Sequence, residues 1–175
     1  ADLVGLYLGA TDQAGQVAFA GFITRLVDAN TFGNLMATPN TGPALAAGAY
    51  MTALASEYYQ TINTLALAKG AEHVLILNVP DITLTPRFKA VLYGVTQQAG
   101  EATAGQLKAA IQGWAQAFNA KLAELAADES RVAIADFYTD FSNQTADPSS
   151  YGITNATDAA CPVVGADSQG LPQYN

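Results

Sequence analysis

Short apolar runs along the chain predict three buried β-strands. The runs cover residues 3–8, 74–79 and 132–137. Each run is apolar at consecutive positions and contains β-branched residues, as expected for a strand that is covered on both faces of its sheet. Sheets covered in this way are typically parallel, because their crossover helices pack on both faces. The runs therefore predict the strands of a parallel sheet.

Longer stretches between these runs carry apolar residues at helical spacing. Alanine fills much of the remainder of these stretches and favours helix. Gly70 follows one of them, at a place where helices commonly end with glycine. The most regular stripe consists of Leu107, Ile111, Trp114, Phe118, Leu122 and Leu125, and two others lie within residues 19–27 and 50–65.

The alternation of predicted strands and helices indicates an α/β fold with a parallel sheet. A length of 175 residues suits a single domain, residues 1–175. Residues 140–175 show little periodicity, and we expect a long irregular loop that covers the domain. Three strands are few, because a sheet commonly has about 4–6. We therefore expect a partial domain, cut at both ends, whose sheet is completed by a further polypeptide segment.

The charge pattern excludes several classes of partner. The chain has 15 acidic and 7 basic residues, a net charge of −8, and its basic residues are scattered. Nucleic acids and anionic membrane surfaces both require clustered positive charge, so neither partner is expected. No stretch is apolar enough to cross ~30 Å of hydrocarbon, so no membrane span is expected. The acidic balance and the small number of lysines favour a secreted or cell-surface protein.

Side chains that commonly bind metals are scarce. The chain has one histidine, His73, and one cysteine, Cys161, and we expect neither a metal nor a cofactor. His73 precedes a predicted strand, on the side of the sheet opposite to the expected crevice, and is interpreted as a surface residue. Asp136 and Asp140 follow the third predicted strand and are interpreted as capping residues. Cys161 is either a buried thiol or half of a disulfide whose partner lies outside this chain.

A turn after the first predicted strand is a candidate ligand site, because ligands of open α/β sheets bind beyond the carboxyl ends of strands. The turn contains Gly9 and Thr11, followed by Asp12. A glycine there lets the backbone come close to a substrate. The alternative is a plain turn, in which Thr11 or Asp12 caps the next helix.

A second candidate turn follows the strand of residues 74–79. Pro80 ends this strand, and Ile82 and Leu84 offer apolar side chains for the wall of a pocket. The alternative is a proline-stiffened turn with Asp81 as a cap. No serine of the chain lies in a Gly-x-Ser-x-Gly or Gly-Asp-Ser motif, so these 175 residues offer no nucleophile of that kind.

The order of these motifs resembles the bacterial secreted SGNH/GDSL hydrolases, a family of lipases and esterases. The turn at residues 9–12 looks like the Gly-x-Asn-Asp block of the family. Residues 70–86, the helix that contains Trp114, and residues 136–155 are similar to segments that follow this block in bacterial members. The tail around Cys161 fits the same order. The resemblance covers nearly the whole chain.

This resemblance implies a flavodoxin-like three-layer αβα sandwich, incomplete here, and hydrolysis of carboxylic esters by a serine nucleophile. It places Gly9 and Thr11 on the oxyanion side of the site, and Pro80, Ile82 and Leu84 in the substrate-binding wall. The family's Gly-Asp-Ser block carries the nucleophile, and its Asp-x-x-His block carries the base. Both blocks are absent from these 175 residues and are expected in a flanking polypeptide segment.

One position departs from the pattern of the family. The asparagine whose side chain donates a hydrogen bond to the oxyanion corresponds to Thr11 here. Such a donor commonly contributes a factor of ~10²–10³ to the rate. The alternative function is therefore a non-catalytic SGNH-like binding or surface module, and a flavodoxin-like cofactor binder is a third, weaker candidate without a phosphate loop. The resemblance also implies that Cys161 pairs with a cysteine beyond this chain.

Overall fold

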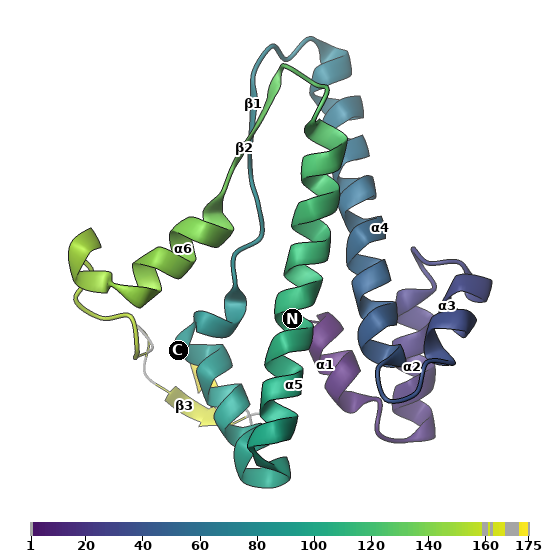
Figure 1. Ribbon diagram of the computed structural model, residues 1–175, viewed down its shortest axis with the longest axis vertical. Helices are drawn as coiled ribbons and strands as arrows, with labels where there is room; N and C mark the ends of the chain where they lie inside the picture. The colour runs from purple at the N-terminus through teal and green to yellow at the C-terminus, as the bar shows by residue number, and fades with distance from the viewer. Residues whose placement is uncertain (1, 159–160, 162, 167–171, 175) are drawn as a thin grey trace. The chain divides into compact units, whose positions relative to one another are not determined.

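The computed structural model describes residues 2–158, 161, 163–166 and 172–174. The chain divides into two compact units. Figure 1 labels their helices and strands. Unit 1 consists of Ala1–Asn78 and Gly113–Ala135, and unit 2 consists of Val79–Gln112 and Asp136–Asn175. The long helix α5 (Pro86–Ala126) contributes residues to both units.

Unit 1 combines helices with a short parallel pair of strands. Asp12 and Asp28 begin helices by accepting backbone N–H groups of the first turn. Gly70, with φ of 94°, ends the helical segment before the first strand, which confirms the stop expected there. The elements are α1 (Asp2–Gly9), α2 (Gln13–Ile23), α3 (Ala29–Met36), α4 (Gly42–Leu65), the 3-10 helix η1 (Leu67–Lys69), β1 (Val74–Leu77) and β2 (Val132–Ala135).

The first predicted strand, residues 3–8, is wrong, because these residues form most of α1. This helix packs against α2 and α4. Tyr7 lies edge-on against the rings of Phe19 and Trp114, with centroid distances of 6.3 and 5.0 Å. A short apolar run suits a buried helix as well as a strand, and here Leu3 and Tyr7 lie one turn apart on the same helical face.

The core of unit 1 forms where α4 meets the stripe of α5. Ala46, Ala47 and Ala55 of α4 are fully buried, and such small residues let neighbouring side chains approach closely. The indole Nε1 of Trp114 donates a hydrogen bond to the carbonyl oxygen of Ala44 at 2.9 Å. This bond satisfies the polar end of a buried aromatic side chain and joins the two helices. The predicted helical stripe around Trp114 is therefore confirmed as core.

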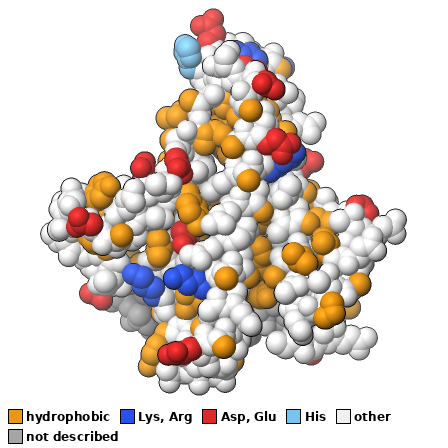
Figure 2. All heavy atoms as spheres, in the orientation of Figure 1, with side chains coloured by type: hydrophobic (Ala, Val, Ile, Leu, Met, Phe, Trp, Pro, Cys, Tyr) orange, Lys and Arg blue, Asp and Glu red, His pale blue; other side chains and the backbone are white. Residues whose placement is uncertain are grey.

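The second and third predicted strands are confirmed as β1 and β2, and they pair in parallel. Val74 faces Val132 in the register, and Leu77 faces Ala135. Ile76 is buried, whereas the neighbouring Leu75 and Leu77 are 67% and 57% exposed. Figure 2 shows apolar side chains on this part of the surface. One face of β1 is therefore packed and the other is open.

The prediction of a flavodoxin-like three-layer αβα sandwich is wrong. The structure is mostly helical, and its parallel sheet contains two strands among the described residues. The run of residues 3–8 supplies a helix in place of the third strand. Since a two-stranded pair offers little surface, the helices pack mainly on one another and do not form two layers around a sheet.

Unit 2 begins directly after β1 with the 3-10 helix η2 (Ile82–Leu84) and the first part of α5. Gly100 interrupts α5 with φ of 84° and ψ of 164°, so the chain turns back and forms a helical hairpin. The chain then returns to unit 2 after β2. This part contains α6 (Phe137–Ala146), the 3-10 helix η3 (Pro148–Tyr151) and the antiparallel strands β3 (Val163–Ala166) and β4 (Pro172–Tyr174).

The described part of residues 140–175 thus contains the end of α6, η3, β3 and β4, where an irregular loop was expected from the composition. No helix in the described part of the chain combines the length and apolar character that crossing a membrane requires.

Candidate functional site

The two residues assigned to the oxyanion side lie at the junction of α1 and α2. Gly9 is the last residue of α1, and Thr11 lies exposed in the turn. Asp12 accepts a hydrogen bond from the backbone N–H of Gly15 at 2.8 Å, which confirms the interpretation of this turn as a helix cap. Because a helix precedes the turn, the strand-end argument for a ligand site at Gly9 and Thr11 does not apply.

The residues assigned to the substrate-binding wall lie in unit 2, after β1. Pro80 follows the strand, and Ile82 and Leu84 are the first and last residues of η2. Leu84 lines a pocket of about 200 Å³, whereas Pro80 and Ile82 do not. Gly9 and Thr11 belong to unit 1, so the structure describes the two groups of predicted residues in separate units.

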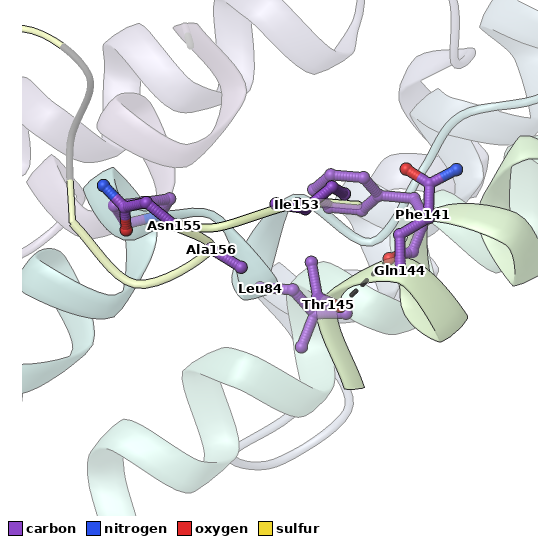
Figure 3. Close-up of a pocket in the computed structure, with 8 residues that line it drawn as sticks. Leu84, Phe141, Gln144, Thr145, Ile153, Asn155 and Ala156 are labelled. Atoms are coloured by element: carbon purple, nitrogen blue, oxygen red, sulfur yellow. Dashed lines mark hydrogen bonds between the residues drawn. The ribbon is translucent and has the colours of Figure 1, made fainter. Parts of the chain in front are cut away.

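The walls of this pocket, hereafter the apolar pocket, come from three segments of unit 2 (Figure 3). One is the end of η2 with the start of α5, another is α6, and the third is the turn after η3. Phe141 of α6 and Ile153 of the turn after η3 are the pocket's large apolar side chains from these two segments. The lining consists of Leu84, Pro86, Phe141, Gln144, Thr145, Ile153, Asn155 and Ala156.

Two of the polar lining residues are bonded to nearby backbone. The hydroxyl of Thr145 donates to the carbonyl oxygens of Phe141 and Ser142, each at 3.0 Å. The Oδ1 atom of Asn155 accepts the backbone N–H groups of Thr157 and Asp158 at 3.1 and 2.9 Å. These groups are therefore occupied, and the pocket offers mainly apolar surface to a ligand.

The sequence analysis missed Phe141 and Ile153 because both lie in the segment expected to be an irregular loop. The sequence carries a signal for Phe141, because Phe137 and Phe141 are four residues apart, the spacing of neighbours on one helical face. In the structure their ring centroids lie 5.8 Å apart on α6. Ile153 carries no such local signal. It follows Gly152, whose φ of 69° ends η3 and turns the chain, and it lines the same pocket as Phe141.

A buried carboxylate fixes the turn that carries Leu84. Asp81 is 4% exposed and Thr83 is 2% exposed. The Oδ1 atom of Asp81 accepts the backbone N–H of Thr83 at 3.0 Å and its hydroxyl at 2.5 Å. The Oδ2 atom accepts the side-chain Nε2–H of Gln112 at 2.7 Å. Asp81 is therefore a cap, as one sequence interpretation held, and also a link to α5.

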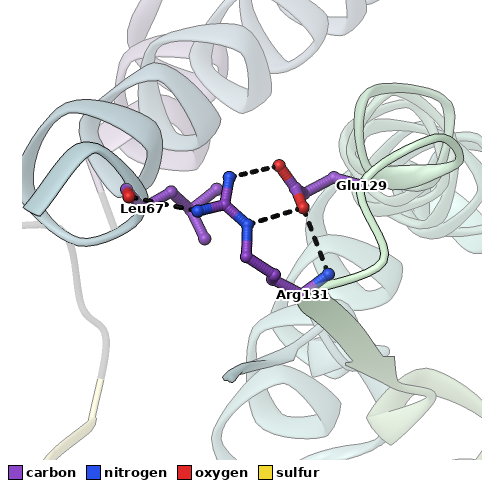
Figure 4. Close-up of polar contacts among 3 residues, drawn as sticks. All are labelled: Leu67, Glu129 and Arg131. Atoms are coloured by element: carbon purple, nitrogen blue, oxygen red, sulfur yellow. Dashed lines mark hydrogen bonds and ion pairs between the residues drawn. The ribbon is translucent and has the colours of Figure 1, made fainter. Parts of the chain in front are cut away.

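A second polar cluster lies in unit 1, at the start of β2 (Figure 4). Arg131 Nε and Nη2 donate to the two carboxylate oxygens of Glu129 at 2.9 and 2.7 Å, and Nη1 donates to the carbonyl oxygen of Leu67 at 3.2 Å. The hydrogen bonds from Arg131 lower the pKa of Glu129 to about 2. Burial raises the pKa of nearby Tyr59, and the charge of Glu129 adds to this effect. The cluster joins η1 to the start of β2.

His73 and Cys161 take no part in the apolar pocket. His73 is exposed, as expected for a surface residue. Cys161 is exposed as well, so the interpretation as a buried thiol is wrong. It forms no disulfide within the described residues, and its pairing with a cysteine beyond this chain stays a prediction. Asp136 accepts the backbone N–H of Thr139 at 3.2 Å, which confirms its capping role.

Several serine hydroxyls are bonded within their own elements. Ser56 and Ser142 donate to backbone carbonyl oxygens one helical turn earlier. Ser149 and Ser150 donate to the carboxylate of Asp147, and these bonds, mainly that of Ser150, lower the pKa of Asp147. The described residues contain no group of His, Cys, Asp and Glu side chains suited to a metal ion.

The apolar pocket can bind an apolar group of limited size, with one polar side chain at hand. That side chain is the amide of Gln144. No family model, no curated protein and no solved structure matches the chain. The function is therefore argued from the pocket and from the order of the sequence motifs.

Proposed function

We propose that this chain supplies the acyl-binding part of a serine carboxylic ester hydrolase of the SGNH/GDSL type. The observation that carries the proposal is the apolar pocket, because one of its walls is Leu84, a residue assigned to the substrate wall from the sequence. Phe141 and Ile153 extend this wall with further apolar surface. The substrate is an ester whose acyl chain enters the apolar pocket.

The size of the apolar pocket sets the length of this acyl chain. A cavity of ~150 Å³ holds benzene, so a volume of about 200 Å³ suits about eight carbon atoms. Burial contributes about 0.8 kcal/mol for each methylene group. Burial of a six-carbon acyl group then contributes about 4 kcal/mol, which is offset in part by the cost of association. The side-chain amide of Gln144 in the lining is a donor that suits the ester carbonyl at the end of such a chain.

The proposal assigns the nucleophilic serine and the histidine base to a further polypeptide segment. That segment adds a strand beside β1 or β2, because both strands are short and expose the edges of a parallel pair. The exposed Leu75 and Leu77 give it an apolar face to cover. Catalysis then proceeds by acyl transfer to the serine followed by attack of water. A secreted or cell-surface location is part of the same proposal.

The test is hydrolysis of p-nitrophenyl hexanoate by the chain alone and together with a polypeptide that carries the Gly-Asp-Ser and Asp-x-x-His blocks. We expect no hydrolysis above background from the chain alone. Together, the two should hydrolyse the ester, and a fluorophosphonate that reacts with activated serine should stop the reaction. Leu84→Gln should lower kcat/KM at least about tenfold, because it places an amide in the apolar wall.

The matched control is Leu45→Gln, which changes a leucine that is 44% exposed on α4 in unit 1. It should leave kcat/KM unchanged. The proposal would be contradicted if Leu84→Gln and Leu45→Gln lowered kcat/KM equally, or if the combined polypeptides did not hydrolyse the ester. An inactive combination that still binds the ester would favour the non-catalytic binding module, for which Thr11 in place of asparagine is the specific argument.

A further inference from the structure

Several hydrogen bonds fix the turn between β1 and α5. Asp81 begins η2 by capping Thr83, and the backbone N–H of Leu84 donates to the carbonyl oxygen of Asp81 at 3.2 Å. Immediately after Leu84, the hydroxyl of Thr85 accepts the backbone N–H of Phe88 at 3.3 Å and so caps the start of α5. Leu84 therefore stands between two successive caps.

Gln112 connects this turn to a distant part of unit 2. It lies 31 residues after Asp81, on the returning arm of the α5 hairpin, and its amide donates to Asp81 at 2.7 Å. Asp81 is nearly inaccessible to water, so the loss of this donor would leave a buried carboxylate oxygen without that partner. The contact therefore ties η2 to the helix that returns beside it.

We propose that Asp81, held by Thr83 and Gln112, is a positioning residue that fixes Leu84 in the wall of the apolar pocket and thereby sets the length of acyl chain that binds. This inference rests on the proposed function. Neither Asp81 nor Gln112 lines the apolar pocket, so their effect passes through Leu84 and the adjoining Pro86. A wall held at one position discriminates chain length, whereas a mobile wall adapts to chains of different length.

The test measures the Kd of a series of methyl esters, from butanoate to decanoate, by ligand-detected NMR with the 175-residue chain. For the natural sequence, affinity should rise about fourfold with each added methylene group until the apolar pocket is full, and then level off. In Asp81→Ala and Gln112→Leu, affinity should rise less than about twofold with each added methylene group. The chain length at which affinity levels off should also be less sharply defined.

Two further variants separate positioning from general stability. Asp81→Asn keeps an oxygen for Thr83 and presents an N–H to Gln112, whose amide can turn to accept it, so the natural chain-length profile should be restored. Gln106→Leu changes an exposed glutamine on the same arm of α5 and should also preserve the profile. The double variant Asp81→Ala/Gln112→Leu should show the same dependence of Kd on chain length as Asp81→Ala alone, because both changes break the same connection.

The outcomes distinguish this inference from the proposed function. A natural profile in both Asp81→Ala and Gln112→Leu would overturn the positioning role and leave ester binding intact. An absence of any chain-length dependence in the unaltered chain would overturn the proposed function itself. Because Asp81→Ala removes a buried group, Gln112→Leu, which keeps a side chain of similar size on a helix, provides the decisive comparison if the alanine variant does not fold.

Discussion

Asp12, Asp81 and Asp136 each precede a helical segment and accept a backbone N–H from its first turn. The sequence could predict these three roles, because an aspartate before a helix satisfies a donor that would otherwise have no partner. It could not predict the additional bond from Gln112 to Asp81, which depends on how the α5 hairpin returns. The capping roles of these aspartates could therefore be predicted from the local sequence, whereas contacts between distant segments could not.

Glu129 gives a prediction for the dependence of stability on pH. Its folded-state pKa of about 2 lies below its ordinary value of 4.5, because Arg131 donates hydrogen bonds to the charged carboxylate. The pair therefore stabilises the folded state above about pH 4.5, and this contribution is lost as the pH falls from about 4.5 to about 2. Glu129→Gln should lower the urea midpoint at pH 7, and its difference from the natural sequence should shrink across this window.

Glu57→Gln on α4 is the control, because Glu57 is an exposed carboxylate outside the cluster of Arg131. Its urea midpoint should follow the natural sequence at every pH. A Glu129→Gln deficit that stays constant between pH 7 and pH 2 would show that the ion pair does not carry the acid dependence.

At the scale of elements, Gly100 determines that α5 is a hairpin and not one straight helix. Its φ of 84° with ψ of 164° lies in a region that is essentially restricted to glycine. Gly100→Ala should therefore destabilise the folded state by about 1–3 kcal/mol, measured by urea unfolding. Gly105→Ala, at a helical position where an added Cβ meets no atom within 4 Å, should be neutral or stabilise by up to about 1 kcal/mol.

Equal effects of the two alanine substitutions would contradict the assigned turn at Gly100. The sequence shows why this turn was missed. Residues 86–126 combine helix-forming residues with a scattering of glycines at positions 94, 100, 105 and 113. Glycine inside a helical pattern is often tolerated, so no local rule selects Gly100 over the others as the place where the chain turns back.

The wrong prediction of a strand has a different cause in the run of residues 3–8. Its consecutive apolar residues suit both a buried strand and a buried helix. The aromatic contacts of Tyr7 with Phe19 and Trp114 decide in favour of helix, and the contact with Trp114 joins residues more than 100 positions apart. By contrast, the strands predicted at residues 74–79 and 132–137 do form, over the shorter ranges 74–77 and 132–135. Gly70 and Pro80 flank the first of them and leave room only for a short strand.

At the scale of the whole molecule, β1 leaves one apolar face open to solvent. Leu75 and Leu77 are open to solvent while Ile76 between them is buried. Parallel strands are usually covered on both faces. This arrangement is the physical basis for the proposal that a further polypeptide segment adds to the sheet and brings the missing catalytic groups.

The central claim is that the apolar pocket of unit 2 binds the acyl chain of an ester. The most direct measurement is a methyl-detected NMR titration of the 175-residue chain with methyl hexanoate. The methyl resonances of Leu84 and Ile153 should shift together and saturate as methyl hexanoate is added, whereas those of Leu45 in unit 1 should not move. Shifts that never saturate, or equal shifts at Leu45, would contradict the claim.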